Sequence, residues 1–461
     1  MGIWVRLCVG STIGLLAGLL ALAAPGKSQD LGQTSTVLAS LPPMGWNSWD
    51  SYGLSVTEDE FRANASWLAQ HLAKHGWQYV VVDEGWYLQN PEAKPGSFRF
   101  TMSADGRYLP AVNRFPSAND AGFKPLADWA HGLGLKFGIH IIRGIPREAV
   151  DRNLPIAGST YHAADAADKA DTCPWNADNY GVTDTPAGQA YYDSLAKLYA
   201  SWGLDFVKID CIASRPYKGP EIRMFSQALR KTGRPIVLSL SPGPAPLDKL
   251  QELRKYAQMW RISDDFWDRW KASKQSFPQG LLPQFNLTAN WAPYVGSGHW
   301  PDADMLPLGY IGPRPGWGKA RETELTQDEQ RTVMTLWSVF RSPLIMGGNL
   351  TRMDEWTTSL LTNDEVLTVD QHSKANRVVA NDAKKAVWTA QPATQSGLYV
   401  ALFNLDDQPQ TLQFDWADLS LSGKVHRVRD LWQHRDLGSS KKLRVILRPH
   451  ASVLYGVAET K

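Results

Sequence analysis

Apolar positions alternate between two patterns along most of the chain. Short apolar runs of the length of a buried strand are followed by segments with an apolar residue every three or four positions, as in amphipathic helices. The runs predict strands at 44–46, 79–83, 136–142, 205–211, 235–240, 259–263, 300–306 and 343–346. About eight strand–helix units in succession predict an α/β fold, a (β/α)8 TIM barrel with enlarged loops, over residues 41–371.

The pattern changes after about residue 371. Seven short alternating runs, separated by turn residues, follow one another to the C-terminus. This pattern is typical of antiparallel sheets, and it predicts a C-terminal β-sandwich over residues 372–461. The region has no obvious cluster of acidic residues, so we expect it to have a packing or accessory role.

The N-terminus has the pattern of a signal peptide. Arg6 precedes an apolar stretch, Gly10–Ala24, that ends in a small-residue cleavage site. We predict a signal at 1–24, a flexible lead-in at 25–40 and a secreted or periplasmic protein without membrane contact after cleavage; an uncleaved anchor is the alternative. Cys173 and Cys211 remain in the mature chain, and an even pair in an exported protein predicts a disulfide, with two free buried thiols as the alternative.

Composition narrows the possible partners. A net charge of +2 over 461 residues argues against a nucleic-acid or anionic-lipid surface. The chain has 20 tryptophans. Tryptophan rings suit the faces of sugars, although they also fill protein cores.

Charged and aromatic side chains recur where the predicted strands end, which is where barrel enzymes carry their active sites. These residues are Trp46, Asp83, Glu84, His140, Lys208, Asp210, Arg261, Asp264, Asp265, Asp302 and Asp304. Carboxylates repel one another, so such a cluster indicates a functional site. For Lys208 and Asp210 alone, a structural ion pair closing a strand explains the pattern equally well.

Three chemistries use converging carboxylates. A metal could bind His299, Asp302 and Asp304, but the acid spacing is too sparse for a typical hard-cation loop. Lys208 could form a Schiff base, but Asp210 two residues away would keep the amine charged. Glycoside hydrolysis needs two facing carboxylates, polar groups for hydroxyls and an aromatic floor, and the sequence supplies all three. We therefore expect an oligosaccharide or polysaccharide substrate and no metal or cofactor.

Six motifs carry a resemblance to a known family. They are LPPMGWNSW (41–49), YVVVDEGW (79–86), LKFGIH (135–140), WGLDFVKIDC (202–211), WRISDDF (260–266) and HWPDADML (299–306). Together and in this order they resemble glycoside hydrolase family 27, which includes α-galactosidases and α-N-acetylgalactosaminidases. The resemblance implies a barrel followed by a β domain, and a retaining double displacement without metal.

The resemblance also implies roles for individual residues. Asp210 matches the nucleophile and Asp265 the acid/base, with Asp264 as the competing assignment. Lys208 and Arg261 would hold Asp210 ionised. Asp83 and Glu84 match the acidic pair that binds the sugar O4 and O6. Trp46 resembles the aromatic floor, and Asp304 with Met305 the far wall.

Three departures from the family pattern bear on the sugar. Glu84 stands where Asp is usual and could crowd a C6 hydroxymethyl group, His140 replaces a tyrosine, and Ser241 begins a segment of small residues near the 2-substituent. The leading hypothesis is an exported retaining exo-glycosidase that removes terminal α-D-galactosyl residues. Activity on α-N-acetylgalactosaminides, β-L-arabinopyranosides or isomaltose units of dextran is the alternative. A further alternative is a carbohydrate-binding protein without catalytic activity.

Overall fold

The computed structural model describes residues 37–272, 277–394, 396–422 and 425–459, which belong to one compact unit, Val37–Lys461. The predicted signal at 1–24 lies outside these residues, as does the lead-in up to residue 36. Within the described ranges, no helix has both the length and the apolar character to cross a membrane.

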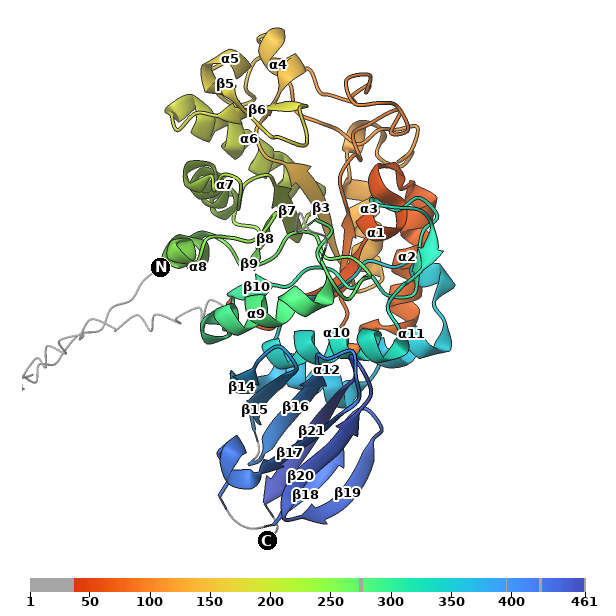
Figure 1. Ribbon diagram of the computed structural model, residues 1–461. Helices are drawn as coiled ribbons and strands as arrows, with labels where there is room; N and C mark the ends of the chain where they lie inside the picture. The colour runs from red at the N-terminus through yellow and green to blue at the C-terminus, as the bar shows by residue number, and fades with distance from the viewer. Residues whose placement is uncertain (1–36, 273–276, 395, 423–424, 460–461) are drawn as a thin grey trace, which may run out of the picture. The chain divides into compact units, whose positions relative to one another are not determined.

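Eight parallel strands form the barrel sheet, as predicted (Figure 1). In chain order they are β1 (Met44–Asn47), β2 (Tyr79–Val82), β3 (Lys136–Ile142), β7 (Phe206–Asp210), β8 (Val237–Leu240), β9 (Met259–Arg261), β10 (Trp300–Asp302) and β13 (Leu344–Met346). The order in the sheet is β10-β9-β8-β7-β3-β2-β1-β13, and a parallel bridge between Leu306 and Met346 joins its two ends. The carboxyl ends of all eight strands therefore face the same mouth.

Helices follow the strands and cover the outside of the sheet (Figure 1). The longer ones are α2 (Glu58–His71), α3 (Lys124–Gly132), α6 (Pro186–Trp202), α7 (Gly219–Lys231), α8 (Leu250–Tyr256), α9 (Leu281–Trp291), α10 (Gln327–Phe340), α11 (Glu355–Leu361) and α12 (Asp364–His372). The sequence has the capping-box pattern at Thr57 and Glu60 and again at Thr326 and Glu329, and these boxes start α2 and α10.

The long connection after β3 folds into a small structure of its own. It contains α4 (Arg147–Asp151), α5 (Ala163–Ala166) and a three-stranded antiparallel sheet of β4 (Ile145–Pro146), β6 (Asn179–Val182) and β5 (Ala167–Thr172). Cys173 follows β5 directly. Two further short elements lie in other loops: α1 (Trp49–Tyr52) after β1, and the pair β11 (Tyr310–Ile311) and β12 (Arg321–Glu322).

The C-terminal strands pair only in antiparallel fashion, as the alternating pattern predicts. One sheet has the order β14 (Ser373–Asn381), β15 (Lys385–Pro392), β16 (Leu398–Asn404), β21 (Ser452–Glu459), β18 (His426–Asp430), β19 (Arg435–Ser440). The other pairs β17 (Gln410–Asp415) with β20 (Lys442–Leu447). The sequence did not predict β19, because its residues are almost all polar or small and exposed, so no apolar alternation marks it.

Candidate active site

One hollow gathers the polar side chains of the strand ends. It is lined by Trp49, Asp50, Asp83, Glu84, His140, Trp175, Lys208, Asp210, Ser241, Arg261, Asp265, Phe266, Trp267, Asp304 and Met305. Seven of the eight barrel strands contribute to it, through residues near their carboxyl ends or the residues that follow. The strand ends thus converge as the barrel geometry requires.

Strand β7 shows how the alternation of side chains along a strand turns the polar groups towards the hollow. Val207 and Ile209 are both fully buried in the core, and the alternation of side chains places Lys208 and Asp210 on the other face, towards the hollow. Lys208 lies beside His140 in the pairing of β7 with β3. The apolar residues of the strand therefore hold the charged ones in place.

Asp83 is an ionised, fully bonded carboxylate. Its Oδ2 accepts hydrogen bonds from Lys208 Nζ at 3.1 Å and from Asn47 Nδ2 at 2.7 Å. Burial alone would raise the pKa of Asp83, but His140, Lys208 and the hydrogen bonds lower it to about 2. Lys208 thus pairs with Asp83, and its own pKa is raised by that carboxylate against the effect of burial, so the amine stays protonated and is no Schiff-base nucleophile.

Glu84, next in the chain, behaves in the opposite way. Burial, together with the charges of Asp210 and Asp83, raises its pKa from 4.5 to about 8. Its Oε1 accepts a hydrogen bond from Asn176 Nδ2 at 2.7 Å, which fixes the position of the carboxyl group. Near neutral pH Glu84 is therefore a neutral acid that can donate a hydrogen bond, whereas Asp83 can only accept.

Both oxygens of the Asp210 carboxylate are hydrogen-bonded. Ser241 Oγ donates to Oδ1 at 2.7 Å, and Trp175 Nε1 donates to Oδ2 at 2.9 Å. The next residue, Cys211, has a positive φ of 61° and forms a disulfide with Cys173, which confirms the predicted pairing. Asp210 is thereby held by two hydrogen bonds and by a covalent bridge at its neighbour.

The two acids after β9 have different surroundings. Asp264 is 7% exposed and both its oxygens accept hydrogen bonds from Arg215, at 2.8 and 3.0 Å. The side chain of Asp265 is 41% exposed and lines the hollow, with one bond from Arg261 at 3.2 Å. Of the two, Asp265 alone is placed to reach a bound molecule.

Arg261 and Asp304 form a buried ion pair at 2.6 Å on the far wall. Burial raises the pKa of Asp304, and Arg261 opposes that effect. The backbone of Asp304 has a φ of 90°, a region that an L-residue adopts only under strain. Such strain persists where surrounding contacts impose it, here the bonds from Arg261 and from Phe266 N at 2.8 Å.

Two further buried groups face the hollow. Burial, with Asp304 nearby, raises the pKa of Asp50 well above its usual value. Its Oδ2 has no hydrogen-bond partner among the described residues. Burial lowers the pKa of His140 and keeps the imidazole neutral at neutral pH.

Two other arrangements do not compete with this site. The described residues contain no cluster of three or more His, Cys, Asp or Glu that could hold a metal ion. A larger cavity of about 560 Å³ lies against the C-terminal sheet and α12. Its acidic residues Glu365 and Asp436 both pair with Arg429, so the cavity has no converging free acids among its lining residues.

Comparisons with known proteins match both parts of the chain to alpha galactosidase family models. Residues 176–372 match the family model for alpha galactosidase A, and residues 382–457 match the alpha galactosidase C-terminal beta sandwich domain. The chain is 50% identical to a family 27 β-L-arabinopyranosidase from Geobacillus stearothermophilus, with a TM-score of 0.87, over 92% of this chain and 97% of that one.

The chain belongs to glycoside hydrolase family 27. It is therefore a glycoside hydrolase. More distant relatives include an alpha-galactosidase from Oryza sativa, 27% identical over 91% of this chain and 85% of its own length. An alpha-galactosidase A from Cellvibrio japonicus is 26% identical and covers 96% of both chains.

For this family 27 member, the structure brings all but one of the expected sugar-site residues into the hollow. The exception is Trp46, which was expected to form the aromatic floor. Its ring is 0% exposed and its indole donates to Gly348 O at 2.9 Å, so it belongs to the core. Trp49, two positions after the end of β1, lines the hollow instead.

The sequence analysis did not single out six residues at the hollow: Trp49, Asp50, Trp175, Phe266 and Trp267, which line it, and Asn176, which bonds Glu84. Asp50 and Trp49 lie in the motif at 41–49 or directly after it, so a count along the turn after β1 could have found them. Trp175 and Asn176 lie in a long loop without periodicity. The signal for them was Cys173, because a disulfide to Cys211 brings the following residues close to Asp210.

Proposed function

We propose that this hydrolase is a retaining exo-glycosidase whose preferred substrate is a terminal β-L-arabinopyranoside. In our scheme the Asp210 carboxylate attacks the anomeric carbon while Asp265 protonates the leaving oxygen, which gives a covalent glycosyl-enzyme and a free alcohol. Asp265 then takes a proton from water, whose oxygen attacks the same carbon and releases Asp210. The sugar keeps its anomeric configuration after these two displacements.

The placement of Glu84 carries the choice of sugar. β-L-Arabinopyranose has the hydroxyl arrangement of α-D-galactose but lacks the hydroxymethyl group on C5. Glu84 stands at the position of the pair that binds O4 and O6 in the family, and it is one methylene longer than the usual Asp. The hydrogen bond from Asn176 at 2.7 Å favours this position of the longer side chain, in which it would crowd a hydroxymethyl group. The 50% identity to the Geobacillus arabinopyranosidase supports the same choice.

The charge state of each residue around the sugar would decide whether it accepts a hydrogen bond from a hydroxyl or donates one to it. Asp83, ionised and held by Lys208, accepts hydrogen bonds from hydroxyls. Protonated Glu84 can donate one, and Lys208 has further N–H groups to donate. Trp49 would provide the apolar floor in place of Trp46. The hollow thus has donors and acceptors for a hydroxyl-rich ring.

An α-D-galactoside is the second candidate, because the catalytic pair would be the same for both sugars. A panel of nitrophenyl β-L-arabinopyranoside, α-D-galactoside, α-N-acetylgalactosaminide and α-glucoside decides between them. We expect the arabinoside to have the highest kcat/KM. Rejecting the hydroxymethyl group by crowding should give at least a tenfold preference, about 1.4 kcal/mol. A higher kcat/KM on the galactoside would contradict the proposed sugar.

The variant Glu84→Asp tests the cause of this preference. Shortening the side chain by one methylene should open space for the hydroxymethyl group and shift the kcat/KM ratio towards the galactoside by tenfold or more. Glu355→Asp shortens an exposed glutamate of α11 by the same methylene and serves as the matched control. An unchanged ratio in Glu84→Asp would show that another residue selects the sugar.

We also propose that the enzyme is exported. The N-terminal pattern of Arg6 followed by the apolar stretch Gly10–Ala24 supports a cleaved signal. The disulfide between Cys173 and Cys211 fits an oxidising compartment. Expression of the full chain followed by N-terminal sequencing of the product tests this proposal. A protein that stays inside the cell with Met1 intact would contradict it.

A further inference from the structure

The loop that follows β5 reaches the site through two neighbouring residues. The indole of Trp175 donates to Asp210 Oδ2 at 2.9 Å, and the amide of Asn176 donates to Glu84 Oε1 at 2.7 Å. One short segment therefore contacts both the proposed nucleophile and the proposed selector of the sugar. The rest of Trp175 lies at the mouth of the hollow, with 46% of the residue exposed.

Three independent contacts hold this loop. The disulfide joins Cys173, two residues before Trp175, to Cys211, the residue after Asp210. Arg143 is buried and donates both to Cys211 O at 2.7 Å and to Asp171 Oδ1 at 2.8 Å. One guanidinium therefore joins β5, from which the loop starts, to the residue after Asp210. The exposed tryptophan thus has little freedom to leave the carboxylate.

The third contact fixes the ring itself. The guanidinium of Arg215 lies 5.8 Å from the centre of the Trp175 ring and is itself held by the buried Asp264 at 2.8 Å. A cation over an aromatic face is favourable, and the indole of Trp is the best of the rings for this contact. This contact also explains Asp264, which does not reach the hollow but orients Arg215.

We propose that Trp175 is a positioning residue for the nucleophile. It holds Asp210 Oδ2 through its indole N–H while Ser241 holds Oδ1, so that the carboxylate keeps one orientation as it attacks. This inference rests on the proposed function, in which Asp210 is the nucleophile. Without the indole N–H the carboxylate can turn about its Cβ–Cγ bond, and a smaller share of orientations is productive.

The substitution Trp175→Phe keeps an aromatic ring under Arg215 but removes the N–H. Trp129→Phe is the matched control, because Trp129 also lies under an arginine, with Arg62 at 4.5 Å from its ring centre, but belongs to α3 outside the site. Each variant is assayed on the aryl glycoside that the parent hydrolyses best, together with the Ki of the free sugar and the melting temperature.

We expect Trp175→Phe to lower kcat by ten- to a hundredfold, the range for losing a hydrogen bond to a charged group. The Ki of the free sugar should change less than twofold, because the residues that contact the sugar stay in place. In the Trp129→Phe control, kcat and Ki should stay within twofold of the parent values, and the melting temperature should stay the same. A kcat within twofold of the parent would overturn the inference, as would a Ki or a melting temperature that worsens along with kcat.

The test also separates this inference from the proposed function. If the proposed sugar is wrong, the parent hydrolyses another glycoside of the panel, and the comparison of variants is made on that one. A parent that hydrolyses none of them contradicts the proposed function and this inference together. A parent with normal turnover and an unaffected Trp175→Phe variant contradicts the inference alone.

Discussion

Two neighbouring acids, Asp83 and Glu84, have opposite protonation states at neutral pH. Asp83 is surrounded by donors and cations, and these contacts outweigh its burial. Glu84 has one amide donor and two acids near it, so burial and repulsion together raise its pKa to about 8. A neutral acid beside an ionised one gives the site both a donor and an acceptor for adjacent hydroxyls.

This difference predicts a loss of activity at alkaline pH. The pKa of Glu84 is raised, so its carboxyl is neutral below about pH 8 and ionises above it. The new charge would lie beside Asp83 and Asp210 and would weaken substrate binding, so kcat/KM should fall above that pH. Glu84→Gln cannot ionise and should lack this alkaline limb, at a lower plateau. Profiles of kcat/KM for both proteins check the prediction, and an identical alkaline limb in both would contradict it.

Single residues show where prediction from the sequence succeeded and where it did not. The acids Asp83, Asp210 and Asp265 could be placed because each follows an apolar strand whose end is fixed by barrel geometry. Trp46 and Trp49 could not be told apart, since both are tryptophans in one motif. Only packing decides that Trp46 is fully buried and Trp49 lines the hollow.

At the scale of elements, periodicity located the barrel strands and several helices but not the insertions. The capping boxes gave the starts of α2 and α10, because the cap chemistry is local. The sheet of β4, β5 and β6 has no periodic signal in the sequence, since β4 is only Ile145–Pro146, β5 is largely polar, and β4 pairs with β6 across the whole insertion. The Trp175 segment depends on that sheet and on the disulfide, so local sequence could not place it.

The start of α10 provides a stability prediction. Thr326 Oγ1 accepts from Glu329 N, and the Glu329 carboxylate accepts from Thr326 N at 2.8 Å. Thr326→Ala removes this cap and should lower the free energy of unfolding by about 1 kcal/mol. Thr358→Ala, in the exposed body of α11, is the control and should change it by less than about 0.5 kcal/mol. Urea unfolding measures both, and equal effects would contradict the cap's role.

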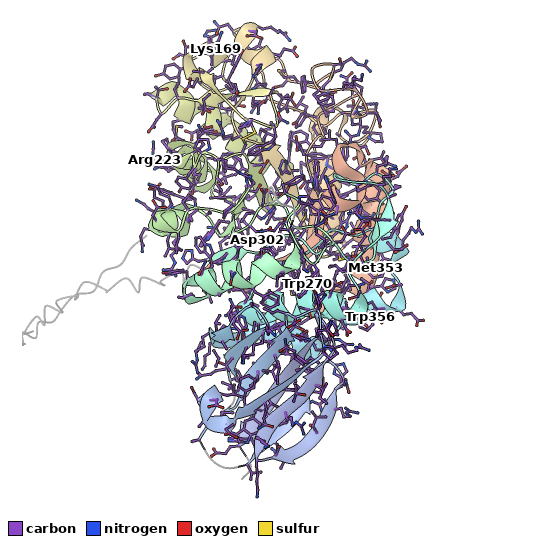
Figure 2. The ribbon with its side chains drawn as sticks, in the orientation of Figure 1. Lys169, Arg223, Trp270, Asp302, Met353 and Trp356 are labelled. Atoms are coloured by element: carbon purple, nitrogen blue, oxygen red, sulfur yellow. A yellow bond between two sulfur atoms is a disulfide. The ribbon has the colours of Figure 1, made fainter. Side chains whose placement is uncertain are left out.

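For the whole molecule, the β-sandwich also supports the loop that carries Asp265. His450 stacks on Trp270, with ring centres 3.9 Å apart, and lies 2.7 Å from Glu329 and 2.9 Å from Asp407 (Figure 2 labels Trp270). Trp270 follows Asp265 by five residues. Residues of the predicted accessory region thus contact the loop that carries Asp265 into the hollow. The sequence did not indicate this contact, because Trp270 and His450 lie in loops that are far apart in the chain.

His450→Ala tests this support. Losing the stacked ring and two charged hydrogen-bond partners should lower the free energy of unfolding by about 2 kcal/mol. It should also lower kcat, because the Asp265 loop loses its support. His434→Ala is the control, since His434 is exposed and contacts only Glu365 among the described acids. Stability and kcat that match the control would show that the sandwich does not support the loop.

The account depends most on Asp210 as the nucleophile. Incubating the enzyme with an activated 2-deoxy-2-fluoro glycoside of the preferred sugar should trap the glycosyl-enzyme, because the fluorine slows its hydrolysis. Digestion and mass spectrometry of the trapped protein would then locate the label. We predict one label per chain, on Asp210. A label on any other residue, or turnover without a trapped intermediate and with inversion at the anomeric carbon, would contradict the account.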